Sequence, residues 1–87
     1  MSMYAERHIM KAIRDAEAAY GWDIDYRLVD QQEVGGAGTR YEYALEVEGQ
    51  YAEDDAQKFF SDYGFEGVYV DYTDYSFAEI RVSVTGM

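Results

Sequence analysis

The sequence predicts one small α+β domain with its elements in the order helix, strand, strand, helix, strand, strand. Apolar residues recur at three- and four-residue spacing in two segments, which is typical of amphipathic helices. They recur at every second residue in four other segments, which is typical of half-buried strands. A chain of 87 residues is long enough for one layered core and too short for two. A single domain over residues 1–87 is therefore expected.

The first half of the chain predicts one helix and a hairpin. The helix has a continuous apolar stripe: Ala5, Ile9, Ala12, Ile13, Ala16 and Tyr20. Gly21 is a typical helix end because glycine adopts the left-handed conformation without strain. Alternation then predicts strands from Trp22 to Leu28 and over residues 41–48. Between them, residues 31–39 contain three glycines in four positions, so we expect a mobile loop with no regular element.

The second half predicts a shorter helix over residues 53–63 and two strands, 65–72 and 76–84, joined by a turn at 73–75. Three acids at the start of the helix favour its positive N-terminal end. Alternation and helical spacing together define the expected core: Trp22, Ile24, Tyr26, Leu28, Tyr43, Leu45, Val70, Ile80 and Val82 from the strands, with Ile9, Ile13, Phe59 and Phe60 from the helices.

The two halves of the chain, 1–49 and 50–87, resemble each other and favour a repeated αββ unit. Both helices open with Tyr-Ala-Glu and close with tyrosine followed by glycine. Two such units form a four-stranded antiparallel sheet with both helices on one face. A right-handed crossover that skips one place gives the strand order first, second, fourth, third. This topology is similar to a ferredoxin-like sandwich whose first strand has moved to the end of the chain, and that resemblance implies no function.

The net charge of −11 is concentrated after the first helix. Residues 1–20 contain three acids and three bases, so the excess of acids lies in the rest of the chain. Such a field repels nucleic acid and anionic membranes and attracts basic surfaces. An alternative explanation of the charge is a salt-adapted proteome in which every protein is this acidic.

Several classes of function are disfavoured by the composition. The chain has no cysteine, which excludes disulfides, thiolate metal ligands and cysteine nucleophiles. The charged residues within 1–20 indicate neither a signal peptide nor a membrane span, so a cytoplasmic location is expected.

No motif predicts catalysis, a cofactor or a metal. The single histidine, His8, lies beside the helical stripe and is expected to be a surface residue. The nearest match to a calcium loop begins at Asp23 but has Arg27 where an oxygen ligand is required. No Lys-Ser or Lys-Thr pair follows the glycines at 35, 36 and 38 to form a phosphate loop. The basic residues Arg7, Lys11 and Arg14 alternate with acids and predict an ordinary solvated helix face. We therefore expect no catalytic residues, no cofactor and no metal, and a chain that is not an enzyme.

The candidate site is the sheet face that the helices leave uncovered. Its expected partner-binding residues are seven acids and two aromatics: Asp23, Asp25, Glu42, Glu46, Glu48, Asp71 and Glu79, with Tyr69 and Phe77. Only Arg27 and Arg81 oppose these acids. Acids two residues apart on a strand are about 6.5 to 7 Å apart, close to the separation of successive phosphates along a nucleic-acid strand. This lattice therefore predicts imitation of a phosphate backbone.

The leading hypothesis is a non-enzymatic acidic binding protein, an inhibitor that mimics nucleic acid. Its partner would be a basic protein surface, such as the nucleic-acid groove of an effector complex, with no direct binding to nucleic acid or membrane. Over its whole length the chain is similar in charge and size to the small acidic inhibitors that phages encode against restriction or CRISPR effectors. One alternative is a homodimeric structural or assembly module of an acidic, salt-adapted or phage proteome. Another is an enzyme or small-ligand protein with a cleft near Trp22 and the glycine loop.

Overall fold

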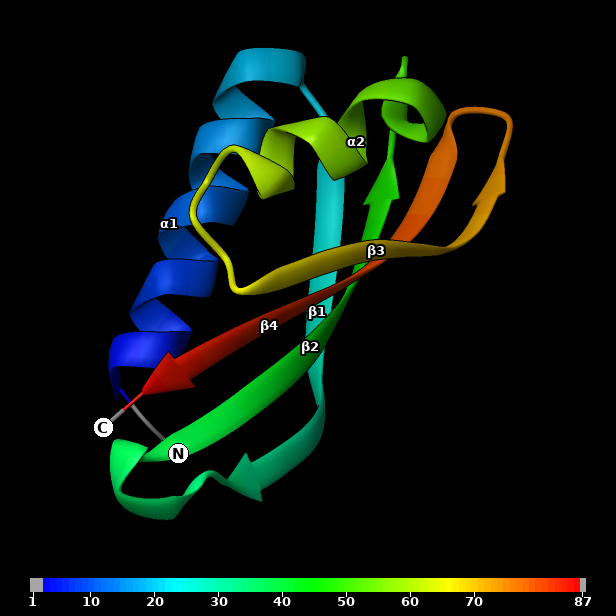
Figure 1. Ribbon diagram of the computed structural model, residues 1–87. Coiled ribbons are helices and arrows are strands. Elements are labelled where there is room, and N and C mark those ends of the chain that lie inside the picture. Colours follow the sequence, from blue (N-terminus) through cyan, green and yellow to red (C-terminus); the bar gives the residue numbers. More distant parts are fainter. Residues whose placement is uncertain (1–2, 87) are drawn as a thin grey trace.

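The computed structural model describes residues 3–86 and confirms the α+β class (Figure 1). Its elements are, in chain order, α1 (Met3–Tyr20), β1 (Asp23–Glu33), a 3-10 turn η1 (Gly35–Ala37), β2 (Thr39–Glu48), α2 (Ala52–Ser61), β3 (Gly67–Asp74) and β4 (Phe77–Gly86). The four strands form one antiparallel sheet in the order β1-β2-β4-β3, as predicted. That the two αββ halves are a duplication stays a prediction.

Both helices lie on one face of the twisted sheet, and the hairpin between β3 and β4 extends beyond them (Figure 1). The core between helices and sheet is formed mainly by alternate residues of β2 and β4. Its largest fully buried side chains are Tyr43, Phe60, Ile9, Leu45, Ile80, Val47 and Val82. Alanines 5, 12 and 16 on α1 are also fully buried, which allows this helix to lie close to the sheet. The other face of the sheet, which neither α1 nor α2 covers, is called the open face below.

Two residues predicted in the core lie at its exposed margin. Tyr26 and Val70 are each 37% exposed. Tyr26 points to the helix side, where its ring lies 6.1 Å from that of Tyr43. Both residues are exposed because β1 and β3 are the edge strands of the described sheet. Each of these side chains therefore has a neighbouring strand on one side only. Leu28 and Phe59 are partly buried at the margin of the core.

The strands are longer than predicted at the glycine loop and at the final turn. Residues 31–33 continue β1, and Glu33 pairs with Thr39. The loop is therefore only Val34 to Gly38, closed by the Val34 N–H donating to the Gly38 carbonyl at 3.0 Å. Backbone pairing needs no apolar side chain, so the polar Gln31 and Gln32 extend the strand. At the last hairpin, β3 continues through Asp74, and the turn is Tyr75 and Ser76.

Trp22 joins the start of β1 to the connection between β2 and α2. Its indole N–H donates to the Gln50 carbonyl at 2.7 Å. Its ring stacks on Tyr20, with centroids 3.9 Å apart and planes 4° apart. Trp22 is only 3% exposed, and the glycine loop lies at the opposite end of the β1–β2 hairpin. The expected cleft shared by Trp22 and the glycine loop is therefore wrong.

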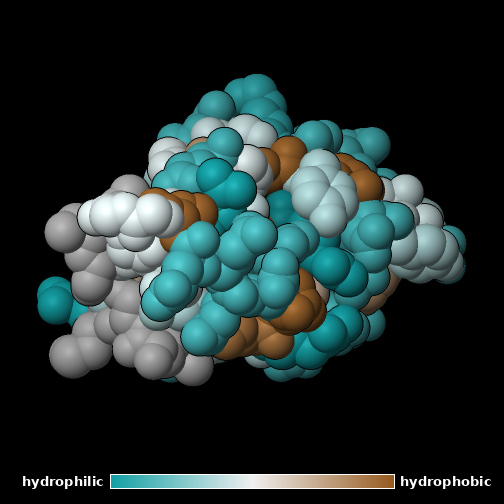
Figure 2. All heavy atoms as spheres, turned by 60° about the horizontal axis from the view of Figure 1, so that its bottom comes forward, coloured by the Kyte–Doolittle hydropathy of each residue, from teal (hydrophilic) through white to brown (hydrophobic). Residues whose placement is uncertain are grey.

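Hydrophilic side chains cover most of the face shown in Figure 2, with hydrophobic atoms visible only in small separate patches. Among residues 3–86, no helix is both long enough and apolar enough to cross a membrane.

Candidate functional site

The strand register brings the predicted site residues together on the open face. Cross-strand partners share a face, and the pairing defines four rows across the sheet. These rows are Asp23, Glu48, Phe77 and Asp74; Asp25, Glu46, Glu79 and Tyr72; Arg27, Ala44, Arg81 and Tyr69; and Asp30, Glu42, Ser83 and Gly67. Asp71 is the ninth predicted residue, and it reaches the same face because its carboxylate lies 3.5 Å from Arg81.

The two arginines neutralise three of the seven predicted acids. Arg27 Nη2 lies 3.6 Å from Glu79 Oε2. Arg81 contacts Glu42 at 3.8 Å and Asp71 at 3.5 Å. Ala44 lies between the arginines in the same row and is only 1% exposed, so neighbouring side chains cover this part of the open face. The centre of the face is therefore a network of mixed charge, in contrast to the lattice of acids that the sequence predicted.

Tyr69 belongs to this network. Its hydroxyl donates a hydrogen bond of 3.1 Å to Glu42 Oε2. This hydrogen bond is the main cause that raises the pKa of Tyr69 above its usual value, because the charged acceptor stabilises the protonated hydroxyl. Tyr69 is nevertheless 50% exposed, so a partner can contact it.

The remaining four acids form an acidic patch: Asp23, Asp25, Glu46 and Glu48. None of them has an ion pair within residues 3–86. They lie directly opposite one another, Asp23 with Glu48 and Asp25 with Glu46. Like charges in such positions destabilise a sheet. Neighbouring strands are about 4.8 Å apart, so the acidic patch is a compact two-by-two array of carboxylates.

Aromatic side chains border the acidic patch on the β3–β4 hairpin. A bulge at Asp71 shifts the register between Val70 and Tyr72, which places Tyr72 on the open face opposite Glu79. Its ring lies 6.1 Å from that of Phe77. Tyr72 is 53% exposed and Tyr75, in the turn, is 87% exposed. Strict alternation places Tyr72 on the helix side, so Tyr72 was not among the predicted site residues.

A second site, which the sequence did not predict, is a groove between α1 and the end of α2. Its volume is about 640 Å³, and its lining residues are Tyr4, Arg7, His8, Lys11, Asp62 and Tyr63. Two of these side chains belong to the helix surface for which we expected only solvation, namely Arg7 and Lys11. The apolar spacing of α2 did indicate that Tyr63 faces the core, but not that it contacts α1.

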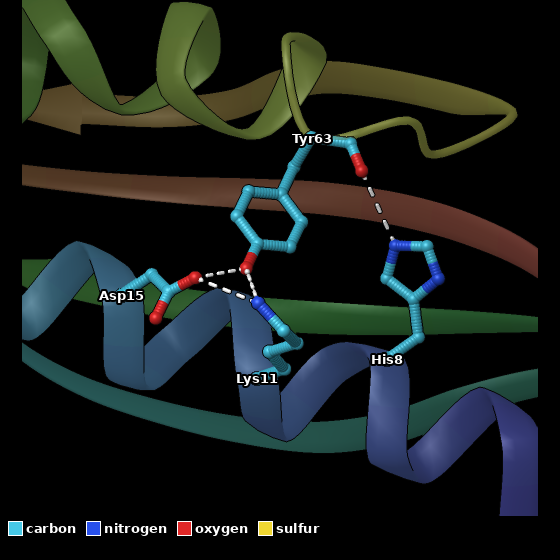
Figure 3. Close-up of polar contacts among 4 residues, drawn as sticks. All are labelled: His8, Lys11, Asp15 and Tyr63. Atoms are coloured by element: carbon cyan, nitrogen blue, oxygen red, sulfur yellow. Dashed lines mark hydrogen bonds and ion pairs between the residues drawn. The ribbon is translucent and has the colours of Figure 1, made fainter.

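Tyr63 connects the end of α2 to three successive turns of α1 (Figure 3). Its hydroxyl donates to the Asp15 carboxylate and accepts a hydrogen bond of 3.1 Å from Lys11 Nζ. Lys11 also forms an ion pair of 3.2 Å with Asp15. The Tyr63 carbonyl lies 3.3 Å from His8 Nε2 and accepts a hydrogen bond from it in the tautomer that has the proton on this nitrogen. His8 is half-buried, and its ring centroid is 4.5 Å from that of Phe65. Its contacts are thus those of a packing residue between the helices.

We predict that Tyr63→Phe raises the pKa of the Asp15 carboxyl toward its usual value. The hydrogen bond from the Tyr63 hydroxyl is the main cause that lowers this pKa, followed by the hydrogen bond from Lys11. Because the pKa is lower in the folded chain than in the unfolded chain, the contact stabilises the fold at neutral pH. This stabilisation is lost as the pH falls through the folded-state pKa. A carbon-detected NMR titration of Asp15 measures the change, and an unaltered pKa in the variant would contradict the contact.

Within residues 3–86, no group of three or more acidic or histidine side chains is arranged to hold a metal ion. Comparison with protein-family models, curated proteins and solved structures found no match. The function must therefore be argued from the open face and the groove themselves.

Proposed function

We propose that this chain is a non-enzymatic binding protein that inhibits a nucleic-acid-handling protein by placing its acidic patch in that protein's basic groove. The observation that carries the proposal is the set of uncompensated carboxylates on the open face. Asp23 opposes Glu48, and Asp25 opposes Glu46. Pairs of this kind reduce the stability of a sheet, and a partner that supplies cations would relieve the repulsion.

The surroundings of the acidic patch favour a protein partner over a dissolved counterion. Phe77 and Tyr72 share rows with the acids, and Tyr75 lies in the adjoining turn. Aromatic side chains provide large contact areas at the centre of protein interfaces. Arg27 and Arg81 do not oppose the proposal, because their charges are balanced by Glu79, Glu42 and Asp71.

The proposal is tested by competition with DNA. Labelled duplex DNA is bound to purified restriction endonucleases or RNA-guided nucleases, and its release on addition of the chain is followed by fluorescence anisotropy. We expect displacement at low salt that weakens strongly as the Debye length falls from about 10 Å at 0.1 M to about 3 Å at 1 M salt. If no effector releases DNA at low salt, these classes of partner are wrong. Displacement that does not change with salt would contradict recognition through charge.

A second candidate function is supported by the free edges of the sheet. Within residues 3–86, the outer edge of β3 has no neighbouring strand, and β3 carries the exposed Val70. An edge strand of this kind can pair with a second copy of the chain. A homodimeric assembly module would show a stable dimer in light scattering whose association does not depend on salt. A monomer at all salt concentrations would exclude it.

A further inference from the structure

The groove between α1 and α2 lies on the helix side of the sheet, away from the open face. Its volume of about 640 Å³ lies within the range of about 300 to 1,000 Å³ that is typical of small-molecule sites. We propose that this groove binds a small aromatic carboxylate. This function is separate from the proposed inhibitor activity.

The aromatic preference follows from three rings in the lining. Tyr4 and His8 are arranged edge to face, with centroids 6.0 Å apart and planes at 84°. His8 and Tyr63 are also 6.0 Å apart, at 63°. Rings held at steep angles present both faces and edges, which are the surfaces that a further aromatic ring packs against. Tyr4 is 58% exposed, so a ligand can reach its ring from solvent.

The preference for a single negative charge follows from the local ion pairs. The ammonium of Lys11 is balanced by Asp15 at 3.2 Å, and the carboxylate of Asp62 is balanced by Lys58 at 3.4 Å. Arg7 forms no ion pair within residues 3–86, although it lines the groove. Among the described residues that line the groove, Arg7 is therefore the one cation without an ion pair. A guanidinium binds a carboxylate through two parallel hydrogen bonds.

Tyr63 and Lys11 give the groove a fixed wall. Tyr63 is held to α1 through its hydroxyl and its carbonyl (Figure 3). Lys11 Nζ lies 5.6 Å from the centroid of the Tyr63 ring. These contacts keep the groove in the same shape without a ligand. Binding would therefore cost little conformational entropy.

Benzoate is the probe that tests the site. We expect a saturable titration in amide NMR spectra, with the shifts confined to residues 4–11 and 62–65. Benzyl alcohol has the ring without the charge, and acetate has the charge without the ring, so neither should produce these shifts at equal concentration. Absence of saturable shifts with benzoate would overturn the proposal, as would equal shifts with either control compound.

A matched pair of variants tests the role of Arg7. Arg7→Gln should weaken benzoate binding by about tenfold or more, since it removes the charged hydrogen bonds to the carboxylate. Arg14→Gln changes the net charge equally on the same helix, but Arg14 does not line the groove, so its variant should bind as the parent does. Equal weakening by both variants would show a general effect of charge and overturn the site. Neither variant alters the acidic patch, so the outcome is independent of the inhibitor proposal.

Discussion

Ile80→Ala is expected to reduce the free energy of unfolding by about 2 to 5 kcal/mol, as is usual when a buried isoleucine is truncated to alanine. Ile80 is fully buried. It lies on β4, between Leu45 of β2 and Val70 of β3. Ile13→Ala should act in the same direction from the helix side, because Ile13 is only 7% exposed. Urea unfolding followed by the fluorescence of the single, buried Trp22 measures both changes.

Val70→Ala is the matched control for Ile80→Ala, because Val70 lies directly opposite Ile80 in the sheet. It is 37% exposed on an edge strand, so its truncation should cost about 1 kcal/mol or less. Equal losses for the two variants would mean that Val70 is as buried in solution as Ile80, and would contradict its position at the exposed margin of the core.

Gly49→Ala is expected to reduce the free energy of unfolding by a similar amount, about 2 to 6 kcal/mol, by a different mechanism. Gly49 has φ of 149°, a conformation that strains any residue with a Cβ by about 1 to 3 kcal/mol. A Cβ at this position would also lie 2.6 Å from Trp22 Cδ1 and 3.3 Å from Trp22 Cα. Forcing an extra carbon into a packed site typically costs about 1 to 3 kcal/mol more.

Gly36→Ala is the control for Gly49→Ala, since a Cβ at Gly36 would meet nothing within 4 Å. Its effect on the free energy of unfolding should lie within about 0.5 kcal/mol of zero.

The Trp22 fluorescence of the folded Gly49→Ala variant should also change, because the indole must move. A Gly49 variant as stable as the parent would contradict the packing of Trp22 beneath the β2–α2 connection.

The sequence predicted most of the core because burial follows the periodicity of apolar residues. It predicted the order of the strands because crossover connections are right-handed. Leu45 and Ile80 alternate with polar residues and are fully buried. The errors at Tyr26 and Val70 have a common cause. Alternation shows which side of a strand a residue faces, but not whether that part of the sheet has neighbours. Burial at an edge strand depends on where the helices end, which no local pattern records.

The sequence predicted which face of the sheet carries these residues, but it predicted a lattice of acids where the centre of the face is a network of mixed charge. All nine predicted residues lie on the open face, because alternation determines the face of each strand. The neutralisation of Glu79 by Arg27 depends on two strands that are not adjacent in the sheet, so only the assembled register shows it. Tyr72 was missed because a bulge reverses the side on which the following residues lie, and the residues around Asp71 contain no signal for one.

The most direct test of the central claim compares two triple variants of equal charge in the DNA-displacement assay. Asp25→Asn, Glu46→Gln and Glu48→Gln together remove both repelling pairs of the acidic patch. The control variant carries Asp54→Asn, Asp55→Asn and Asp62→Asn, on and just after α2. We predict that the first variant unfolds at a higher urea concentration than the parent yet no longer displaces DNA. The control should be no more stable than the parent, because acids near the start of a helix are favourable, and it should still displace DNA. If the two variants displace DNA equally, only the total charge matters, and the acidic patch is not the binding site.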